Sequence, residues 1–143
     1  MVQAIAVNPA LFLTRTKHIG ILTMATIFID GQAGTTGIEI ATRLRGHSNL
    51  KLLHIADEQR KDPAVRKQMF QQADVAILCL PDAAAIAAYA LAKGHCRILD
   101  ASSAHRVDPD WVYGLPELTA NNREAIADAE QVSNPGCYPQ GFI

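Results

Sequence analysis

The sequence lacks the features that mark membrane-spanning and nucleic-acid-binding proteins. No apolar run reaches the roughly 18–20 residues that a membrane-spanning helix requires, so we expect no membrane association. The formal net charge is −1 and the basic residues are scattered, which gives no reason to expect a nucleic acid as partner. The chain also contains no internal repeat and no low-complexity tract, which excludes an array of repeated units.

Cysteine is scarce, with Cys79, Cys96 and Cys137 alone in the whole chain. Their odd number, wide spacing and lack of a C-x-x-C pair argue against a disulfide scaffold and predict no metal site. Cys79 lies in an apolar stretch, where we expect it to be part of the core. This cysteine usage indicates a reducing compartment, and we expect a cytoplasmic location.

The first 23 residues differ from the rest because they contain no acidic residue. Their basic residues, Arg15 and Lys17, follow a short apolar patch at 10–13, whereas a secretory signal has its charge before the apolar segment. The stretch is also poor in the serine and arginine of organelle transit peptides. We therefore expect residues 1–23 to be a disordered N-terminal extension, with Met24 as the natural start.

The remaining residues are sufficient for one domain with a proper core, since 49% of the 143 residues are hydrophobic. Short apolar, β-branched runs alternate with helical patterns, which predicts an α/β fold. The specific prediction is a Rossmann-like, doubly wound, mostly parallel sheet spanning residues 24–136. We expect strands at 25–30, 50–56, 73–80, 96–100 and 131–133, helices at 38–45, within 62–72, at 83–93 and at 121–130, and irregular structure at 111–118.

A glycine-rich turn, Gly31-Gln32-Ala33-Gly34-Thr35-Thr36-Gly37, joins the first predicted strand to the first helix. Its pattern is G-x-x-G-x-x-G rather than G-x-G-x-x-G. The backbone N–H groups of such a turn, together with the helix N-terminus, can hold a pyrophosphate. The sequence therefore predicts cofactor contacts from Gly31, Gly34, Thr35, Thr36 and Gly37.

The segment after the second predicted strand bears on the choice between NAD and NADP. Asp57 follows Gly37 by 20 residues and ends that strand, where an acid can bind a ribose 2′-hydroxyl. Arg60 and Lys61 follow directly and would instead hold a 2′-phosphate; the alternative is a solvated loop of mixed charge. We favour NADP and assign Asp57 and Arg60 to the cofactor site.

The third and fourth predicted strands also end in segments suited to a site. In open α/β sheets ligands bind at the carboxyl ends of the strands. Leu80 and Pro81 end the third strand, so we expect them to line the cofactor. Ser102 and Ser103 follow the fourth strand and are further site residues, although serine clusters are also common in plain turns. We interpret His105 as a loop residue rather than a base.

The stretch Ser133-Asn134-Pro135-Gly136-Cys137-Tyr138-Pro139 places a cysteine between two prolines and directly after a glycine. Pro139 suits the first turn of a helix, because the N–H group that it lacks would be unpaired there. Cys137 would then lie at a helix N-terminus, where free N–H groups and the helix dipole favour thiolate over thiol. This predicts a nucleophilic cysteine; the alternative is a small apolar filler.

Taken in order, these motifs resemble those of the N-acetyl-γ-glutamyl-phosphate reductases. Those enzymes of arginine biosynthesis reduce an acyl phosphate to a semialdehyde with NADPH. The related aspartate-semialdehyde dehydrogenases typically set their nucleophile after Gln-Asn, which this chain lacks. The resemblance covers residues 24–143 and rests on the glycine turn, Leu80-Pro81-Asp82, Leu99-Asp100-Ala101-Ser102-Ser103, Tyr113-Gly114-Leu115-Pro116-Glu117 and Asn134-Pro135-Gly136-Cys137-Tyr138-Pro139.

The resemblance implies a role for Cys137 and a small-molecule acyl-phosphate substrate. The thiolate attacks the acyl carbonyl, phosphate leaves and a thioester forms, which hydride from the nicotinamide reduces to a hemithioacetal that collapses to the aldehyde. In the family, the acid–base histidine lies in a second, α+β domain that binds substrate and forms the oligomer. A homo-oligomer is therefore implied for the full-length protein.

The second domain of the family is missing from the given sequence. Residues 137–143 are expected to begin the helix of the catalytic cysteine, so the chain resembles the amino-terminal part of a reductase and should not turn over alone. Two alternatives stay open from the residues themselves. One is a non-catalytic NAD(P)-binding module, and the other is a semialdehyde dehydrogenase with a different substrate.

Overall fold

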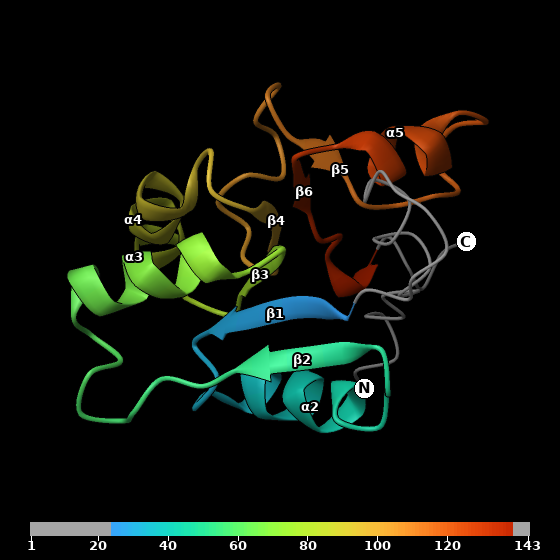
Figure 1. The fold of residues 1–143 in the computed structure, drawn as a ribbon. Coiled ribbons are helices and arrows are strands. Elements are labelled where there is room, and N and C mark those ends of the chain that lie inside the picture. Colours follow the sequence, from blue (N-terminus) through green and yellow to red (C-terminus); the bar gives the residue numbers. More distant parts are fainter. Residues whose placement is uncertain (1–23, 139–143) are drawn as a thin grey trace.

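The computed structural model describes residues 24–138, and the expectations for residues 1–23 and 139–143 lie outside them (Figure 1). Six strands form one sheet in the order β2-β1-β3-β4-β6-β5, and each described neighbouring pair is parallel. The predicted Rossmann-like parallel sheet is confirmed. The strands are β1 (Ala25–Asp30), β2 (Leu50–Leu53), β3 (Val75–Leu78), β4 (Arg97–Asp100), β5 (Val112–Tyr113) and β6 (Gln131–Ser133); the helices are α2 (Thr35–Leu44), α3 (Pro63–Gln72), α4 (Asp82–Ala92) and α5 (Asn122–Asp128).

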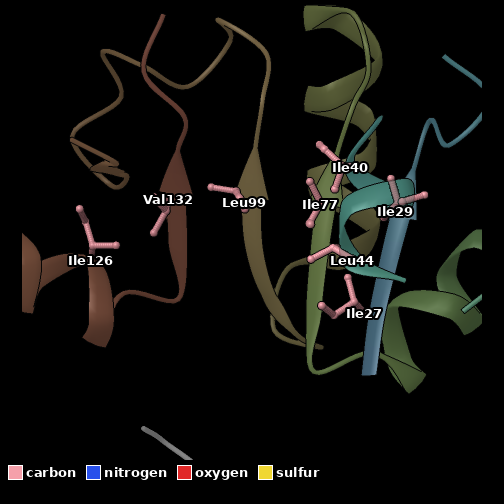
Figure 2. Close-up of a cluster of buried hydrophobic side chains, with 9 residues drawn as sticks. Ile27, Ile29, Ile40, Leu44, Ile77, Leu99, Ile126 and Val132 are labelled. Atoms are coloured by element: carbon pink, nitrogen blue, oxygen red, sulfur yellow. The ribbon is translucent and has the colours of Figure 1, made fainter. Parts of the chain in front are cut away.

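Helices cover both faces of this sheet, as the doubly wound prediction requires. On one face, Ile40 and Leu44 of α2 and Ile126 of α5 pack against residues such as Ile77 and Leu99 (Figure 2). On the other face, α3 and α4 cover the sheet. Successive strand residues point to opposite faces, so these strands must be apolar on both sides. The second cluster contains Phe28, Phe70, Ala76, Leu78, Ala88, Ala92 and Ile98.

Several predicted boundaries differ from the observed ones; β3, for example, spans Val75–Leu78 rather than residues 73–80. β2 ends at Leu53 rather than at residue 56, because it pairs with β1 only as far as Phe28 and the chain then leaves the sheet. α2 begins at Thr35 rather than at residue 38, so the end of the glycine turn forms the first helical turn. The irregular segment 111–118 contains β5, whose two residues pair with β6. Such a short edge strand depends on a distant partner and leaves no local periodicity.

The strand order places a topological switch point between β1 and β3. The chain moves from β1 outward to β2 and then crosses to the other side of β1 to form β3. Ligands of open α/β sheets bind outside the carboxyl ends of the strands at such a point. Within residues 24–138, no helix has the length and apolarity needed to cross a membrane.

Candidate functional site

The carboxyl ends of β1, β3, β4 and β6 lie along one edge of the sheet, because these strands are parallel neighbours. The chain leaves them as the glycine turn (residues 31–37), the segment at 79–81, the serine loop (residues 101–106) and the cysteine loop (residues 134–137). Adjacent strands lie about 4.8 Å apart, so β1 and β6, three positions apart in the sheet, end about 14 Å from each other. The predicted cofactor turn and the predicted nucleophile therefore share one edge.

The glycine turn packs so closely that two of its glycines cannot carry a side chain. Gly31 has φ = 89°, and a Cβ there would overlap the carbonyl oxygen of Cys79 at the end of β3. A Cβ on Gly37 would overlap the carbonyl oxygen of Gly31 and the backbone of Gln32. The turn is thus pressed against β3 and against the start of α2, which keeps backbone N–H groups close to any ligand.

The N-terminus of α2 is open to a ligand. Its N-cap is Gly34, which supplies no side-chain hydrogen bond, and its first turn contains no acidic residue. Thr35 and Thr36 in that turn are exposed. The first amides of a helix have no partner within it and favour anions, so this end suits a pyrophosphate.

The remaining predicted cofactor residues divide into two groups. Leu80 lies against the glycine turn, since its Cδ2 would be 3.0 Å from a Cβ on Gly31, and Pro81 is the N-cap of α4. Asp57 and Arg60 lie in an exposed turn between β2 and α3. The prediction that Asp57 ends the second strand is wrong, because β2 stops four residues earlier.

A buried carboxylate organises the serine loop. Asp100, the last residue of β4, has no exposed surface. It accepts hydrogen bonds from the amide of Ser102 at 2.9 Å and from its Oγ at 2.7 Å, and His105 Nδ1 lies 2.6 Å from the same carboxylate. His105 is in a loop, as predicted, but is buried and stacked on Trp111 with 4.1 Å between ring centroids. Sequence reasoning missed Asp100; the available signal was an acid directly after a buried apolar strand.

A second carboxylate ties the serine loop to α4. Asp82 accepts hydrogen bonds from Ser103 Oγ at 2.7 Å and from the Ser103 amide at 3.0 Å. Both bonds lower the pKa of Asp82, and the bond from the Ser103 hydroxyl has the larger effect. The positive charge of Arg106 lowers this pKa further. Both predicted site serines therefore have hydroxyls engaged with carboxylates of this domain.

Cys137 is exposed at the site edge, and the backbone is helical at Cys137 and Tyr138, the last described residues. This backbone conformation is the one that a helix starting at the cysteine requires; the helix itself stays a prediction. Asn134 connects the cysteine loop to its neighbours: its N–H donates to the Asp100 carbonyl at 2.7 Å, and its carbonyl accepts from Arg106 Nε at 3.1 Å.

The other two cysteines have environments that suppress thiolate formation. Burial is the main cause that raises the pKa of Cys79 to about 12, and the nearby carboxylates of Asp30 and Asp100 add to it. Burial likewise raises the pKa of Cys96 to about 11. Both thiols are protonated at neutral pH, which leaves Cys137 as the exposed cysteine. In the described part of the chain, no three His, Cys, Asp or Glu residues are grouped so that they could hold a metal ion.

Comparison with known families agrees with this geometry. The sequence model of the family described as "Semialdehyde dehydrogenase, NAD binding domain" matches residues 26–129. The chain belongs to this family. The matched region runs from β1 through α5, so the glycine turn and the serine loop lie inside an NAD(P)-binding domain, and the cysteine loop follows it.

Curated relatives of this semialdehyde dehydrogenase domain are named N-acetyl-gamma-glutamyl-phosphate reductase. One from Burkholderia ambifaria is 48% identical over 123 residues, which cover 85% of this chain and 39% of the relative. One from Pseudomonas putida, named N-acetyl-gamma-glutamyl-phosphate reductase 2, is 53% identical over 118 residues, covering 82% and 38%. One from Brucella suis is 51% identical over 119 residues, also covering 82% and 38%. The chain spans about two fifths of the length of these relatives.

Solved structures with a similar fold are aspartate semialdehyde dehydrogenases. The enzyme from Francisella tularensis gives a TM-score of 0.59 at 15% identity, covering 80% of this chain and 37% of its own. Aspartate semialdehyde dehydrogenase II from Vibrio cholerae gives 0.58 at 14% identity, covering 81% and 43%. At this identity the comparison establishes the fold alone.

Proposed function

We propose that this chain is the cofactor-binding and nucleophile-bearing part of an N-acetyl-γ-glutamyl-phosphate reductase. The reaction reduces N-acetyl-γ-glutamyl phosphate to N-acetylglutamate semialdehyde with NADPH, a step of arginine biosynthesis, in the cytoplasm and within a homo-oligomer. The observation that supports it most is the exposed Cys137 on the same sheet edge as the glycine turn. Relatives at about 50% identity bear the name of this enzyme.

The residues at the edge fit a dinucleotide. A pyrophosphate would lie on the amides of the first turn of α2, beside the backbone of Gly31 and Gly34. The Gly34 amide itself donates to the Gly31 carbonyl at 3.0 Å, and the lack of a Cβ at Gly31 and Gly37 lets this turn pack against its neighbouring backbone. Leu80 and Pro81 would line the cofactor beside this turn. When bound, NADPH supplies the hydride.

Two pairs of residues complete the proposed cofactor contacts. Arg60 would bind the 2′-phosphate, with Asp57 beside the same ribose. Ser102 and Ser103 would contribute through the shape of the serine loop, because their hydroxyls already bond to Asp100 and Asp82.

Cys137 is the proposed nucleophile. Its thiolate attacks the acyl carbonyl, the carbon–oxygen bond to phosphate breaks, and phosphate departs with the electron pair. Backbone N–H groups at the start of the cysteine helix would stabilise the oxyanion. We assign the acid–base role to a histidine in the longer relatives beyond the matched length, because His105 is buried against Trp111 and bound to Asp100.

The nucleophile can be tested on the chain as it stands with acetyl phosphate as the simplest acyl phosphate. We expect intact-mass spectrometry to show one added acetyl group, mapped to Cys137, with stoichiometric release of phosphate. Cys137→Ser should show no thioester, whereas Cys96→Ser should behave like the wild type. Acetylation spread over lysines with no acetyl on Cys137 would contradict the assignment and favour a non-catalytic NAD(P)-binding module.

The cofactor preference needs a separate measurement. Calorimetric titration should show tighter binding of NADPH than of NADH, and Arg60→Ala should reduce that difference. Equal affinities in the wild type would contradict NADP as the cofactor without affecting the assignment of Cys137 as the nucleophile. Substrate choice follows from which semialdehyde supports phosphate-dependent NADP⁺ reduction when this sequence is extended with the remainder of the Pseudomonas putida relative.

A further inference from the structure

The serine loop is held in place along almost its whole length. The amide of Ala101 donates to the Leu78 carbonyl at 3.0 Å, and the Ala104 amide donates to Ser102 Oγ at 3.2 Å. Ser102 and His105 contact the buried Asp100 carboxylate. With Ser103 bound to Asp82, the loop is fixed to β3, β4 and α4 together. Its last residue, Arg106, therefore projects from a rigid support.

Arg106 reaches across to the cysteine loop, where it meets a peptide already held on its other side. The amide of Asn134 bonds to the Asp100 carbonyl and thereby belongs to the β4–β6 pairing. The carbonyl of Asn134 lies beyond the last paired residues, Asp100 and Ser133, and accepts from Arg106 Nε at 3.1 Å. Both polar groups of Asn134's backbone are thus fixed, three residues before Cys137.

An arginine is well suited to this contact. Its guanidinium is planar and rigid, so the one bond that Nε donates fixes the approach to the carbonyl more tightly than a freely rotating ammonium group would. Arg106 is partly buried, and its charge acts on Asp82, which is itself bonded to Ser103. A lysine would retain the charge but could not impose the same planar geometry.

We propose that Arg106 is a positioning residue for Cys137, acting through the carbonyl of Asn134. By holding this peptide against the serine loop, Arg106 fixes the direction in which the chain enters the helix that begins at Cys137. The sulfur is thereby kept at the helix N-terminus and toward the cofactor edge. The inference rests on the proposed role of Cys137 as nucleophile.

The test measures alkylation of Cys137 by iodoacetamide at neutral pH, resolved by cysteine with mass spectrometry, in the wild type, Arg106→Lys and Arg106→Met. The matched control is Arg97→Lys, because Arg97 also donates to backbone carbonyls, those of Ile126, Ala127 and Ala129, but at the opposite edge of the sheet. We expect the Cys137 rate to fall about two- to fivefold in both Arg106 variants, the size of a helix-terminus effect, and to stay unchanged in Arg97→Lys.

Cys79 and Cys96 report on the fold in the same samples, since both are only partly exposed and have raised pKa values, so they react slowly while the domain is closed. A general loss of structure would increase their labelling, whereas a loss of positioning lowers that of Cys137 alone. If Arg106→Met exposes them, Arg106→Lys decides the question, because it retains the charge and the aliphatic stem.

Three results would overturn the inference. Unchanged Cys137 rates in both Arg106 variants would show that the contact has no effect on the thiol. A wild-type rate in Arg106→Lys with a reduced rate in Arg106→Met would assign the effect to charge rather than to geometry. A wild-type Cys137 no faster than glutathione would overturn the nucleophile itself, whereas the first two results leave that proposal intact.

Discussion

At the scale of single residues, the two ends of the site differ in how readily the sequence predicts them. Gly31 and Gly37 are recognisable because a backbone that must approach another closely requires glycine, and the pattern follows an apolar run. The roles of Asp100 and Arg106 cannot be recognised in this way. Loop geometry and strand pairing decide which residues they contact, namely Ser102, His105 and Asn134. Spacing in the sequence gives no measure of either.

Gly37→Ala should damage the cofactor turn, whereas Gly46→Ala should not. A methyl group at residue 37 must displace the Gly31 carbonyl and the Gln32 backbone, and overpacking of this kind costs about 1–3 kcal/mol. A methyl group at residue 46 meets no atom within 4 Å, so stability should be retained there. Urea unfolding and NADPH titration of both variants would check this; equal losses, or none at Gly37, would count against the described turn.

At the scale of elements, strands with strong apolar runs and helices between turn residues were predicted correctly, and elements defined by their partners were not. β1 and β6 have the predicted boundaries, since the signal is local. β5 was missed because its two residues become a strand only through pairing with Val132 and Ser133. β2 was predicted too long because an edge strand ends where its neighbour stops pairing, which the sequence does not record.

The raised pKa of Cys79, which directly follows β3, predicts that the folded chain loses stability at alkaline pH. The pKa of Cys79 is raised from 9.0 to about 12 in the folded chain, so its contribution to stability is complete below pH 9 and is lost as the pH rises from 9 towards 12. Over this range the unfolded thiol releases its proton more readily than the folded one. The free energy of unfolding should therefore fall less steeply between pH 8.5 and 10.5 in Cys79→Ala than in the wild type. Identical slopes would show that the pKa of Cys79 is not raised in the folded chain.

At the scale of the whole molecule, one edge of a parallel sheet brings together segments that lie far apart in the sequence. The glycine turn and the cysteine loop are about 100 residues apart along the chain, yet they follow strands separated by only two others in the sheet. The sequence predicted this convergence because all strands of such a fold end at the same edge. The strand order and the bonds around Asn134 required the structure.

The most direct measurement is a titration of the ¹⁵N-labelled chain with NADP⁺, followed by amide chemical shifts. We expect the amide signals of Gly31, Gly34 and Gly37 and of the cysteine loop around Gly136 to shift. The amide signals of Gly46 and Gly94 should not shift, because these residues precede β2 and β4 at the opposite edge of the sheet. Shifts at Gly46 and Gly94 with none in the glycine turn, or no shift at millimolar NADP⁺, would contradict a cofactor site beside Cys137.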